Sequence, residues 1–296
     1  DGLVCAVLLN ELELIDEITF VHPKDMQDGK VPITGRDITT NLPYVAAAHL
    51  AFDHHESETI RNTGERANHI ISASAPSAAR VVYDHYGGKA RFPRISDEMM
   101  DAVDKADSAQ YNRDEVLTPS GWTLLNYLMD SRTGLGRFRN FRISNYALMM
   151  DLIKYCRDHS IEQILALPDV VERVDIYREH ADKAKAQLLA NTTVHGKLAV
   201  LDLRNEETIY ATNRFMIYAL FPQTNISIHV LWGLQKQNTV FATGKSILDR
   251  SSKTNVGELM LQYGGGGHQA AGTCQVDNDR AAEVLAALVK RINADG

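Results

Sequence analysis

Apolar positions in the first half of the chain alternate between helical spacing and short β-rich runs. Residues 2–14 repeat apolar side chains at helical spacing, as do residues 74–88 and 96–111, which begin with Ser/Pro or acidic residues. Two β-rich runs lie between them, "EITFVHP" at 17–23 and "AAHLAF" at 47–52. Strands separated by helices predict a parallel sheet covered on both faces, and ligands of such sheets gather at the carboxyl ends of the strands.

The second half changes from helix to a mixed pattern. Residues 143–190 are strongly helical, and their last part is polar on most faces and lacks Gly and Pro. The β-rich runs "LAVLDL", "NISIHVLWG" and "NTVFATG" then alternate with helix-like segments. We therefore predict an α/β protein with an N-terminal parallel-sheet domain at 1–165, a helical connector at 166–191 and a smaller mixed α/β domain at 192–296.

Composition narrows the range of partners. The 296 residues carry a net charge of −7, which argues against binding of long duplex nucleic acid but allows a small anion held by a few cations. No window reaches the ~18 apolar residues that a membrane span needs. The three cysteines, Cys5, Cys156 and Cys274, lie far apart and form no C-x-x-C pair. We therefore expect a reduced, cytoplasmic protein with buried thiols.

The first residues form an Asp-Gly turn that leads directly into an apolar helix. A chain seldom begins at a functional turn. We therefore expect several further residues, including a strand, upstream of Asp1.

Acidic and histidine residues are expected at the ends of the N-terminal strands. The stretch "AFDHHESETI" at 51–60 ends an apolar run on three groups that are costly to bury. Carboxylates and imidazoles suit manganese, magnesium or similar ions, and residues from several strand ends could enclose two metals roughly 3.5–4 Å apart. Each residue alone is as well explained by a turn, a cap or a structural role. The candidates are Asp1, Asp37, Asp53, His54, His55 and Asp107.

A second candidate site is the glycine-rich stretch "QYGGGGHQAAGTCQV" at 262–276. Four glycines leave the backbone bare for phosphate or carboxylate oxygens, and His268 adds a donor. A flexible linker is the alternative, although a strand-like segment follows at once. Upstream, Lys245, Arg250 and Lys253 form an edge that could contact an anion or simply be solvated.

"FDHHES" followed about two hundred residues later by "GGGGHQAAG" resembles the DHH phosphoesterase superfamily, in the branch with a DHH-associated C-terminal domain. The resemblance covers almost the whole chain. It implies an N-terminal DHH domain and two divalent cations, with Mn²⁺ expected ahead of Mg²⁺ or Co²⁺. That branch includes enzymes that degrade nano-RNA, phosphodiesterases of cyclic and linear dinucleotides, and exopolyphosphatase-related proteins.

The resemblance also implies roles for residues of the N-terminal domain. Asp1 corresponds to the last aspartate of the first family motif, and Asp37 to the second-motif aspartate that bridges two metals. His54 corresponds to the metal-binding histidine, supported by Asp53, and His55 faces the scissile phosphate. The start of the first motif, which completes one metal site, is expected upstream of Asp1.

Further roles follow for later residues. Asp107 is our choice for the fourth-motif aspartate, with Asp104 as the alternative. The substrate-binding loop corresponds to Gly265, Gly266, Gly267 and His268, with Arg250 and Lys245 as phosphate contacts.

The resemblance implies a metal-dependent phosphodiesterase that hydrolyses short single-stranded oligonucleotides or linear dinucleotides, with the small domain closing over the substrate. Hydrolysis of polyphosphate or another phosphoanhydride stays open, as does a non-catalytic nucleotide sensor. Tyr263 and Phe241 offer aromatic surfaces for bases, which favours nucleotides. We expect no long duplex and no membrane as partner, and a homodimer stays open.

Overall fold

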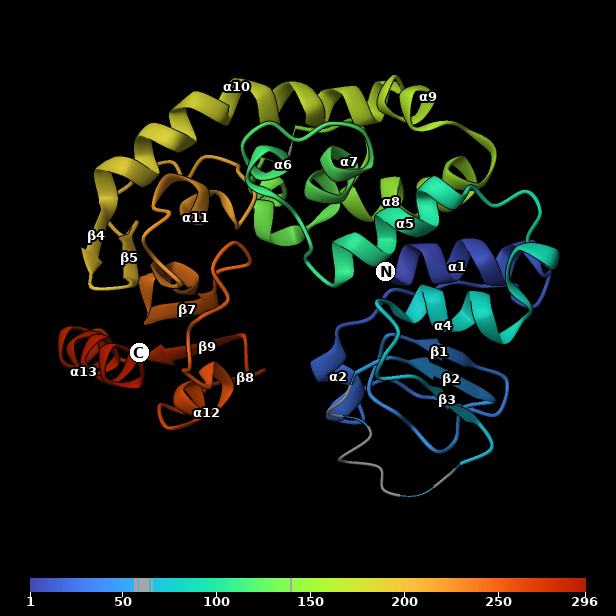
Figure 1. The fold of residues 1–296 in the computed structure, drawn as a ribbon, viewed down its shortest axis with the longest axis horizontal. Helices are drawn as coiled ribbons and strands as arrows, with labels where there is room; N and C mark the ends of the chain where they lie inside the picture. The colour runs from blue at the N-terminus through green and yellow to red at the C-terminus, as the bar shows by residue number, and fades with distance from the viewer. Residues whose placement is uncertain (56–57, 59–63, 65, 139) are drawn as a thin grey trace. The chain divides into compact units, whose positions relative to one another are not determined.

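The structure is a computed structural model that describes residues 1–55, 58, 64, 66–138 and 140–296 (Figure 1). The chain forms two compact units. Unit 1 comprises Asp1–Gln110, Gly121–Asn126 and Asn140–Val171. Unit 2 comprises Tyr111–Ser120, Tyr127–Arg139 and Glu172–Gly296. The domain limits at residues 165 and 191 stay a prediction.

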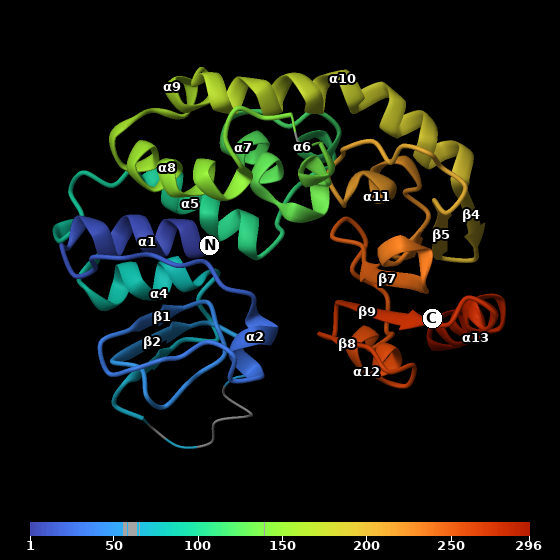
Figure 2. The ribbon, with the colours of Figure 1, turned by 180° about the vertical axis from the view of Figure 1, so that it is seen from behind.

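Unit 1 contains the predicted parallel sheet. Its order is β1-β2-β3, formed by Ile38–Thr40, Leu50–Asp53 and His69–Ile71. The central strand β2 buries Ala51 and Phe52 almost completely, as expected for a strand with parallel neighbours on both sides. Helix α4 (Ala78–His85) lies against the sheet, and α1 (Gly2–Glu11) lies against α4 (Figures 1 and 2).

Three helices of unit 1 lie within the predicted helical segments but are shorter, at Gly2–Glu11, Ala78–His85 and Asp97–Asp107. Helix α1 is apolar on all sides and buries every residue from Val4 to Leu9, because it also contacts α8 (Asn145–Asp158). Ser77 caps α4 by accepting a hydrogen bond from the amide of Arg80. Ser96 caps α5 (Asp97–Asp107), whose first turn is acidic.

Further helices lie in both units. They are α2 (Pro23–Gln27), α6 (Arg113–Leu117), α7 (Gly121–Met129), α9 (Ile161–Leu165) and α10 (Pro168–Asn191), with 3₁₀ turns at Gly88–Ala90, Ser131–Thr133, Leu135–Arg137 and Leu234–Lys236. None of the helices described here is both long and apolar enough to cross a membrane.

The strand predicted at 17–23 is wrong. Residues 17–22 have no regular structure, and Pro23 starts α2. His22 caps this helix, since its Nδ1 accepts a hydrogen bond from the amide of Lys24 at 3.2 Å. The run has β propensity but no strand partner among the described residues, and propensity alone does not make a strand.

Unit 2 contains a six-stranded mixed sheet of order β4-β5-β6-β7-β9-β8. Its strands are β4 (Thr192–His195), β5 (Leu198–Asp202), β6 (Ile226–Trp232), β7 (Thr239–Lys245), β9 (Ala271–Val276) and β8 (Gly266–Gly267). Only β5 and β6 pair in parallel among these strands. This mixed topology confirms the predicted α/β fold class.

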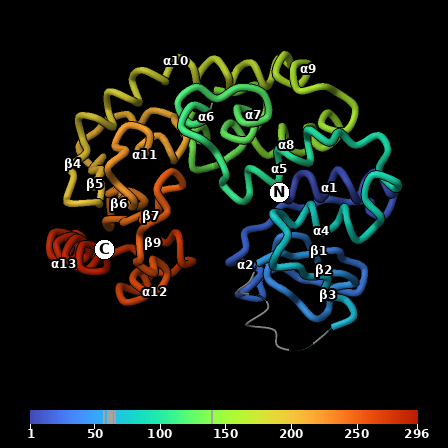
Figure 3. Tube along the Cα trace, in the orientation of Figure 1, coloured from blue at the N-terminus to red at the C-terminus, as the bar shows by residue number. Residues whose placement is uncertain are grey.

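Helices cover both faces of this sheet. Alternate residues such as Ile228, Phe241 and Cys274 form a core with α12 (Val256–Leu261) and α13 (Ala281–Asp295), which run beside β9 in Figure 3. On the opposite face, Tyr218 of α11 (Met216–Leu220) donates a hydrogen bond to the carbonyl of Gly244 at 2.6 Å. The three cysteines are buried and unpaired, as predicted.

Replacement of Phe241 by alanine should destabilise unit 2. Its side chain is 0% exposed at the centre of the core, so truncation leaves a cavity that costs about 3–5 kcal/mol of unfolding free energy. Urea unfolding followed by circular dichroism measures this change. Leu234→Ala is the control, because Leu234 is 76% exposed and should contribute little. Equal stability of the two variants would contradict the assigned core.

Candidate active site

The carboxyl end of β2 carries a buried aspartate that organises the residues after it. Asp53 is 1% exposed. Its Oδ1 accepts hydrogen bonds from the amide of His54 at 2.8 Å and from Nδ1 of His55 at 2.7 Å. These donors offset the cost of burying a carboxylate, and they fix both the backbone turn and the His55 ring.

His54 is oriented so that one ring nitrogen is available to a ligand. Its Nδ1 lies 3.1 Å from the carbonyl oxygen of Ala75, which can only accept, so Nδ1 carries the proton. Nε2 is buried and has no hydrogen-bond partner among the described residues. It lies 2.8 Å from Oδ2 of Asp107, with which it forms an ion pair when the ring is protonated, and 3.9 Å from Oδ2 of Asp1.

Asp1, His54 and Asp107 form one cluster, as the sequence predicts. Their candidate ligand atoms all lie within 4.8 Å of one another. The Asp1 carboxylate accepts hydrogen bonds from the amides of Ala78 and Ala79 at the start of α4, at 2.9 and 2.8 Å. Asp107 is the last residue of α5.

The alternative fourth aspartate, Asp104, lies outside this cluster. Its carboxylate accepts hydrogen bonds from the hydroxyl of Ser77 at 2.7 Å and from Nε of Arg80 at 2.8 Å. Asp104 is therefore engaged in structural contacts, and Asp107 is the better candidate for a ligand.

The close approach of Asp107 and His54 shifts the pKa values of both side chains. Burial alone would raise the pKa of the Asp107 carboxyl, but the nearby imidazole holds it below its ordinary value. Burial alone would lower the pKa of His54, but the Asp107 carboxylate raises it. Each group thus favours the charged form of the other.

This donor set fits a divalent cation. Imidazole nitrogen and carboxylate oxygen are suitable ligands for such ions, and Nε2 of His54 and Oδ2 of Asp53 are both buried without a hydrogen-bond partner among the described residues. The nearby thiol of Cys5 is not a suitable ligand, because burial raises its pKa to about 11 and keeps it protonated.

Asp37 does not join the cluster. It precedes β1 rather than following it, and its Oδ2 accepts hydrogen bonds from the amide and hydroxyl of Thr34 at 2.7 and 2.8 Å. Its carbonyl accepts from the amide of His49, which lies before β2, whereas Asp53 ends β2. Four residues of extended chain correspond to roughly 13 Å. The expectation that Asp37 lies at the carboxyl end of a strand is therefore wrong.

The residue at the carboxyl end of β1 is Asn41, which is not among the predicted ligands. Its amide donates to the carbonyl of Phe52 at 2.9 Å, so it lies beside the end of β2. Its backbone is left-handed with a φ of 55°, and Oδ1 is buried without a hydrogen-bond partner in the described part of the chain. Its position at the end of a strand, before Pro43, is the pattern that could have identified it.

His55 lies next to the cluster with a more open ring. Its side chain is 42% exposed, and its hydrogen bond to Asp53 raises its pKa. An accessible imidazole held by a carboxylate, with its proton stabilised, is suited to donating that proton.

The glycine-rich stretch of unit 2 is an ordered hairpin. Gly266 and Gly267 form β8, which pairs with Gly272 and Thr273 of β9. The carbonyl of His268 accepts a hydrogen bond from the amide of Gly257 at the start of α12, at 2.8 Å. These contacts exclude a flexible linker and leave His268 exposed.

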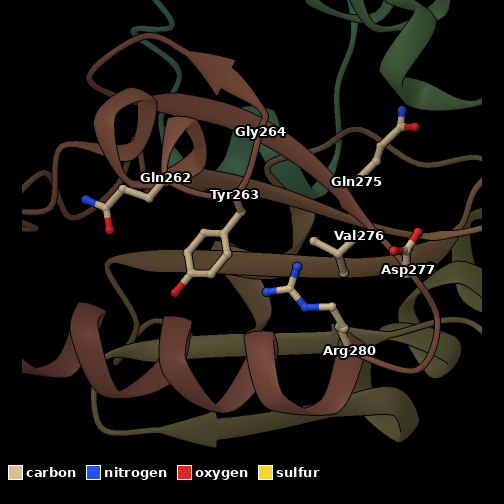
Figure 4. Close-up of a pocket in the computed structure, with 7 residues that line it drawn as sticks. All are labelled: Gln262, Tyr263, Gly264, Gln275, Val276, Asp277 and Arg280. Carbon is tan, nitrogen blue, oxygen red and sulfur yellow. The ribbon is translucent and has the colours of Figure 1, made fainter.

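A pocket of about 340 Å³ adjoins this hairpin (Figure 4). Figure 4 shows the Tyr263 ring and the Arg280 guanidinium pointing into the same space. The residues that line it are Gln262, Tyr263, Gly264, Gln275, Val276, Asp277 and Arg280. Phe241 is fully buried in the core, so the expectation that it offers a stacking surface is wrong.

The predicted cations of unit 2 lie in different settings. Lys245 is next to the end of the hairpin, since its amide donates to the carbonyl of Ala270 at 2.8 Å, and burial lowers the pKa of its side chain. Arg250 is exposed in the connection between β7 and α12.

Comparison with solved structures relates the whole chain to an enzyme. A pGpG-specific phosphodiesterase, PggH from Vibrio cholerae, is 65% identical, with 100% of this chain and 96% of that chain covered and a TM-score of 0.87. The DHH domain of a member of the S1p family of ribosomal proteins is similar in fold, with a TM-score of 0.50 at 11% identity over 96% of this chain and 74% of that one. No family model matches, and no curated protein matches significantly.

The chain belongs to the DHH phosphoesterase superfamily. The DHH triplet of this superfamily is Asp53, His54 and His55 here. The three side chains lie in different environments. Asp53 is buried and fixes the turn, His54 belongs to the carboxylate cluster, and His55 is accessible.

Removal of Asp107 should weaken binding of Mn²⁺ far more than removal of Asp37. Asp107→Ala deletes a carboxylate oxygen of the cluster, whereas Asp37→Ala deletes one that is bonded to Thr34. We expect the Asp107 variant to lose more affinity than the roughly 10- to 100-fold typical of residues that only support ligands. Isothermal titration with Mn²⁺ measures both. A larger loss for Asp37→Ala would contradict the assigned cluster.

Proposed function

We propose that this chain is a metal-dependent phosphodiesterase that hydrolyses linear dinucleotides of the pGpG type to mononucleotides. The supporting observation is the cluster of Asp1, His54 and Asp107 in a chain 65% identical to a pGpG-specific phosphodiesterase. Manganese is the proposed ion, with magnesium or cobalt as substitutes. Water is the proposed nucleophile.

Asp1, His54 and Asp107 would hold the divalent cation. We propose Asn41 as a further oxygen ligand in place of Asp37. Asn41 follows β1 at the carboxyl edge of the sheet, and its Oδ1 is buried without a hydrogen-bond partner among the described residues. When bound, divalent cations lower the pKa of coordinated water and neutralise charge on a phosphate.

The neighbouring residues would position and protonate the substrate. Asp53 holds His55 through its Nδ1, and the raised pKa of His55 favours the protonated ring. We propose that His55 donates this proton to the leaving oxygen, which would otherwise depart as an alkoxide.

The second unit would bind the remainder of the dinucleotide. We assign phosphate contacts to Gly265, Gly266, Gly267 and His268, and propose Lys245 and Arg250 as further phosphate contacts. Tyr263, which lines the pocket beside this hairpin, offers an aromatic face for a base.

Side-by-side assays should show cleavage of dinucleotides rather than of polyphosphate. Purified protein with Mn²⁺ is expected to convert pGpG to GMP, with pApA as a base-exchanged control, and EDTA should abolish turnover because the cations are removed. Chromatography of the products measures the outcome. Release of orthophosphate from polyphosphate without cleavage of either dinucleotide would favour the phosphoanhydride hydrolase. Binding of one ion or none, with no turnover, would favour the sensor.

Alanine at Gly266 should reduce affinity for pGpG without disturbing the fold. A Cβ there meets no atom within 4 Å, so any loss of binding arises from crowding of the substrate. Gly265→Ala is the contrasting variant, because its Cβ would collide with the carbonyl oxygen of Thr273 and the Cα of Cys274 and should disrupt the β8–β9 pairing. Thermal unfolding and the KM for pGpG separate the two effects. An unchanged KM for Gly266→Ala would argue against the proposed contact.

A further inference from the structure

One short segment contacts two members of the carboxylate–histidine cluster directly. The segment is 75–80, which contains the start of α4. Its amides at Ala78 and Ala79 donate to the Asp1 carboxylate, and its carbonyl at Ala75 accepts from His54 Nδ1. Asp1 and His54 are thus positioned relative to the same stretch of backbone.

The same segment also contacts α5, the helix that carries Asp107, the third member of the cluster. Ser77 is 0% exposed, and its hydroxyl donates to Oδ1 of Asp104 at 2.7 Å while accepting from the amide of Arg80 at 2.9 Å. Arg80 donates hydrogen bonds from Nε and Nη2 to the other oxygen of Asp104, Oδ2, at 2.8 and 2.5 Å. Asp104 lies one helical turn before Asp107 on α5.

These contacts connect the end of α5 to the segment that already holds Asp1 and His54. We propose that Ser77 and Arg80 are positioning residues for the metal cluster: through Asp104 they set the place of Asp107 relative to the other two ligands. The proposal rests on the proposed metal site. It goes beyond it because neither residue would touch the cation.

A purely structural role makes a different prediction. If Ser77 served only as the N-cap of α4, its loss would lower stability but leave cation affinity unchanged. If it positions Asp107, its loss also leaves an oxygen of Asp104, whose side chain is 16% exposed, without its donor, so the last turn of α5 shifts and the ligand distances change.

The test compares Ser77→Ala with Ser144→Ala. Ser144 caps α8 by accepting a hydrogen bond from the amide of Ala147 at 3.0 Å, so this control removes a cap of the same kind away from α5. Titration with Mn²⁺ gives the affinity, the visible absorption of the Co²⁺-loaded protein reports the ligand geometry, and thermal unfolding reports stability. We expect Ser77→Ala to weaken Mn²⁺ binding by about 10- to 100-fold and to change the Co²⁺ spectrum. Ser144→Ala should lower only the melting temperature.

Arg80→Lys provides a second variant that leaves the Ser77 cap in place. Lysine keeps the charge but cannot donate from two nitrogens to Asp104, so we expect weaker Mn²⁺ binding here too. Wild-type affinity in Arg80→Lys, or in a folded Ser77→Ala protein, would overturn the positioning role while the metal site stands. Failure of the wild-type protein to bind any Mn²⁺ or Co²⁺ would instead overturn the proposed function, and this proposal with it.

Discussion

A carboxylate buried at the end of a strand must find hydrogen-bond donors, and Asp53 finds them in the two residues that follow it. Its bonds to the His54 amide and the His55 ring force the chain to turn sharply at the edge of the sheet. Because an unmet buried polar group costs about 1–3 kcal/mol, this arrangement is strongly preferred over an open one. The orientation of the His55 ring follows from this requirement, whereas the His54 ring is oriented by the carbonyl of Ala75.

The two glycine positions at 265 and 266 illustrate a similar constraint in the second unit. Gly265 is required by the protein itself, since its backbone packs against β9, whereas Gly266 faces open space. One glycine is thus needed for packing and its neighbour is not. The sequence of a glycine-rich stretch does not reveal which glycines are needed for packing, because that depends on the strands paired around it.

Part of the first site could be predicted, because the resemblance assigned Asp1, His54 and Asp107 to metal motifs, and the three side chains do lie together. The expectation that all of them follow strands is wrong, since only His54 follows one, whereas Asp1 precedes α1 and Asp107 ends α5. Asp37 was misplaced because β1 is only three residues long, and its ends cannot be told apart by periodicity. Asn41 is hard to recognise because an asparagine close to a proline, here Pro43, is also typical of a turn. Its buried oxygen becomes visible only when the neighbouring strand is in place.

The hydrogen bonds from the start of α4 to Asp1 join residues 77 and 78 positions apart. Contacts of such long sequence separation form late, because the intervening chain must first be ordered. The cluster therefore cannot be assembled by local folding of α1 or of the β2 turn, and a growing chain lacks it until α5 has been synthesised. The proposed cation site would therefore form only after the chain from Asp1 to the end of α5 has folded together.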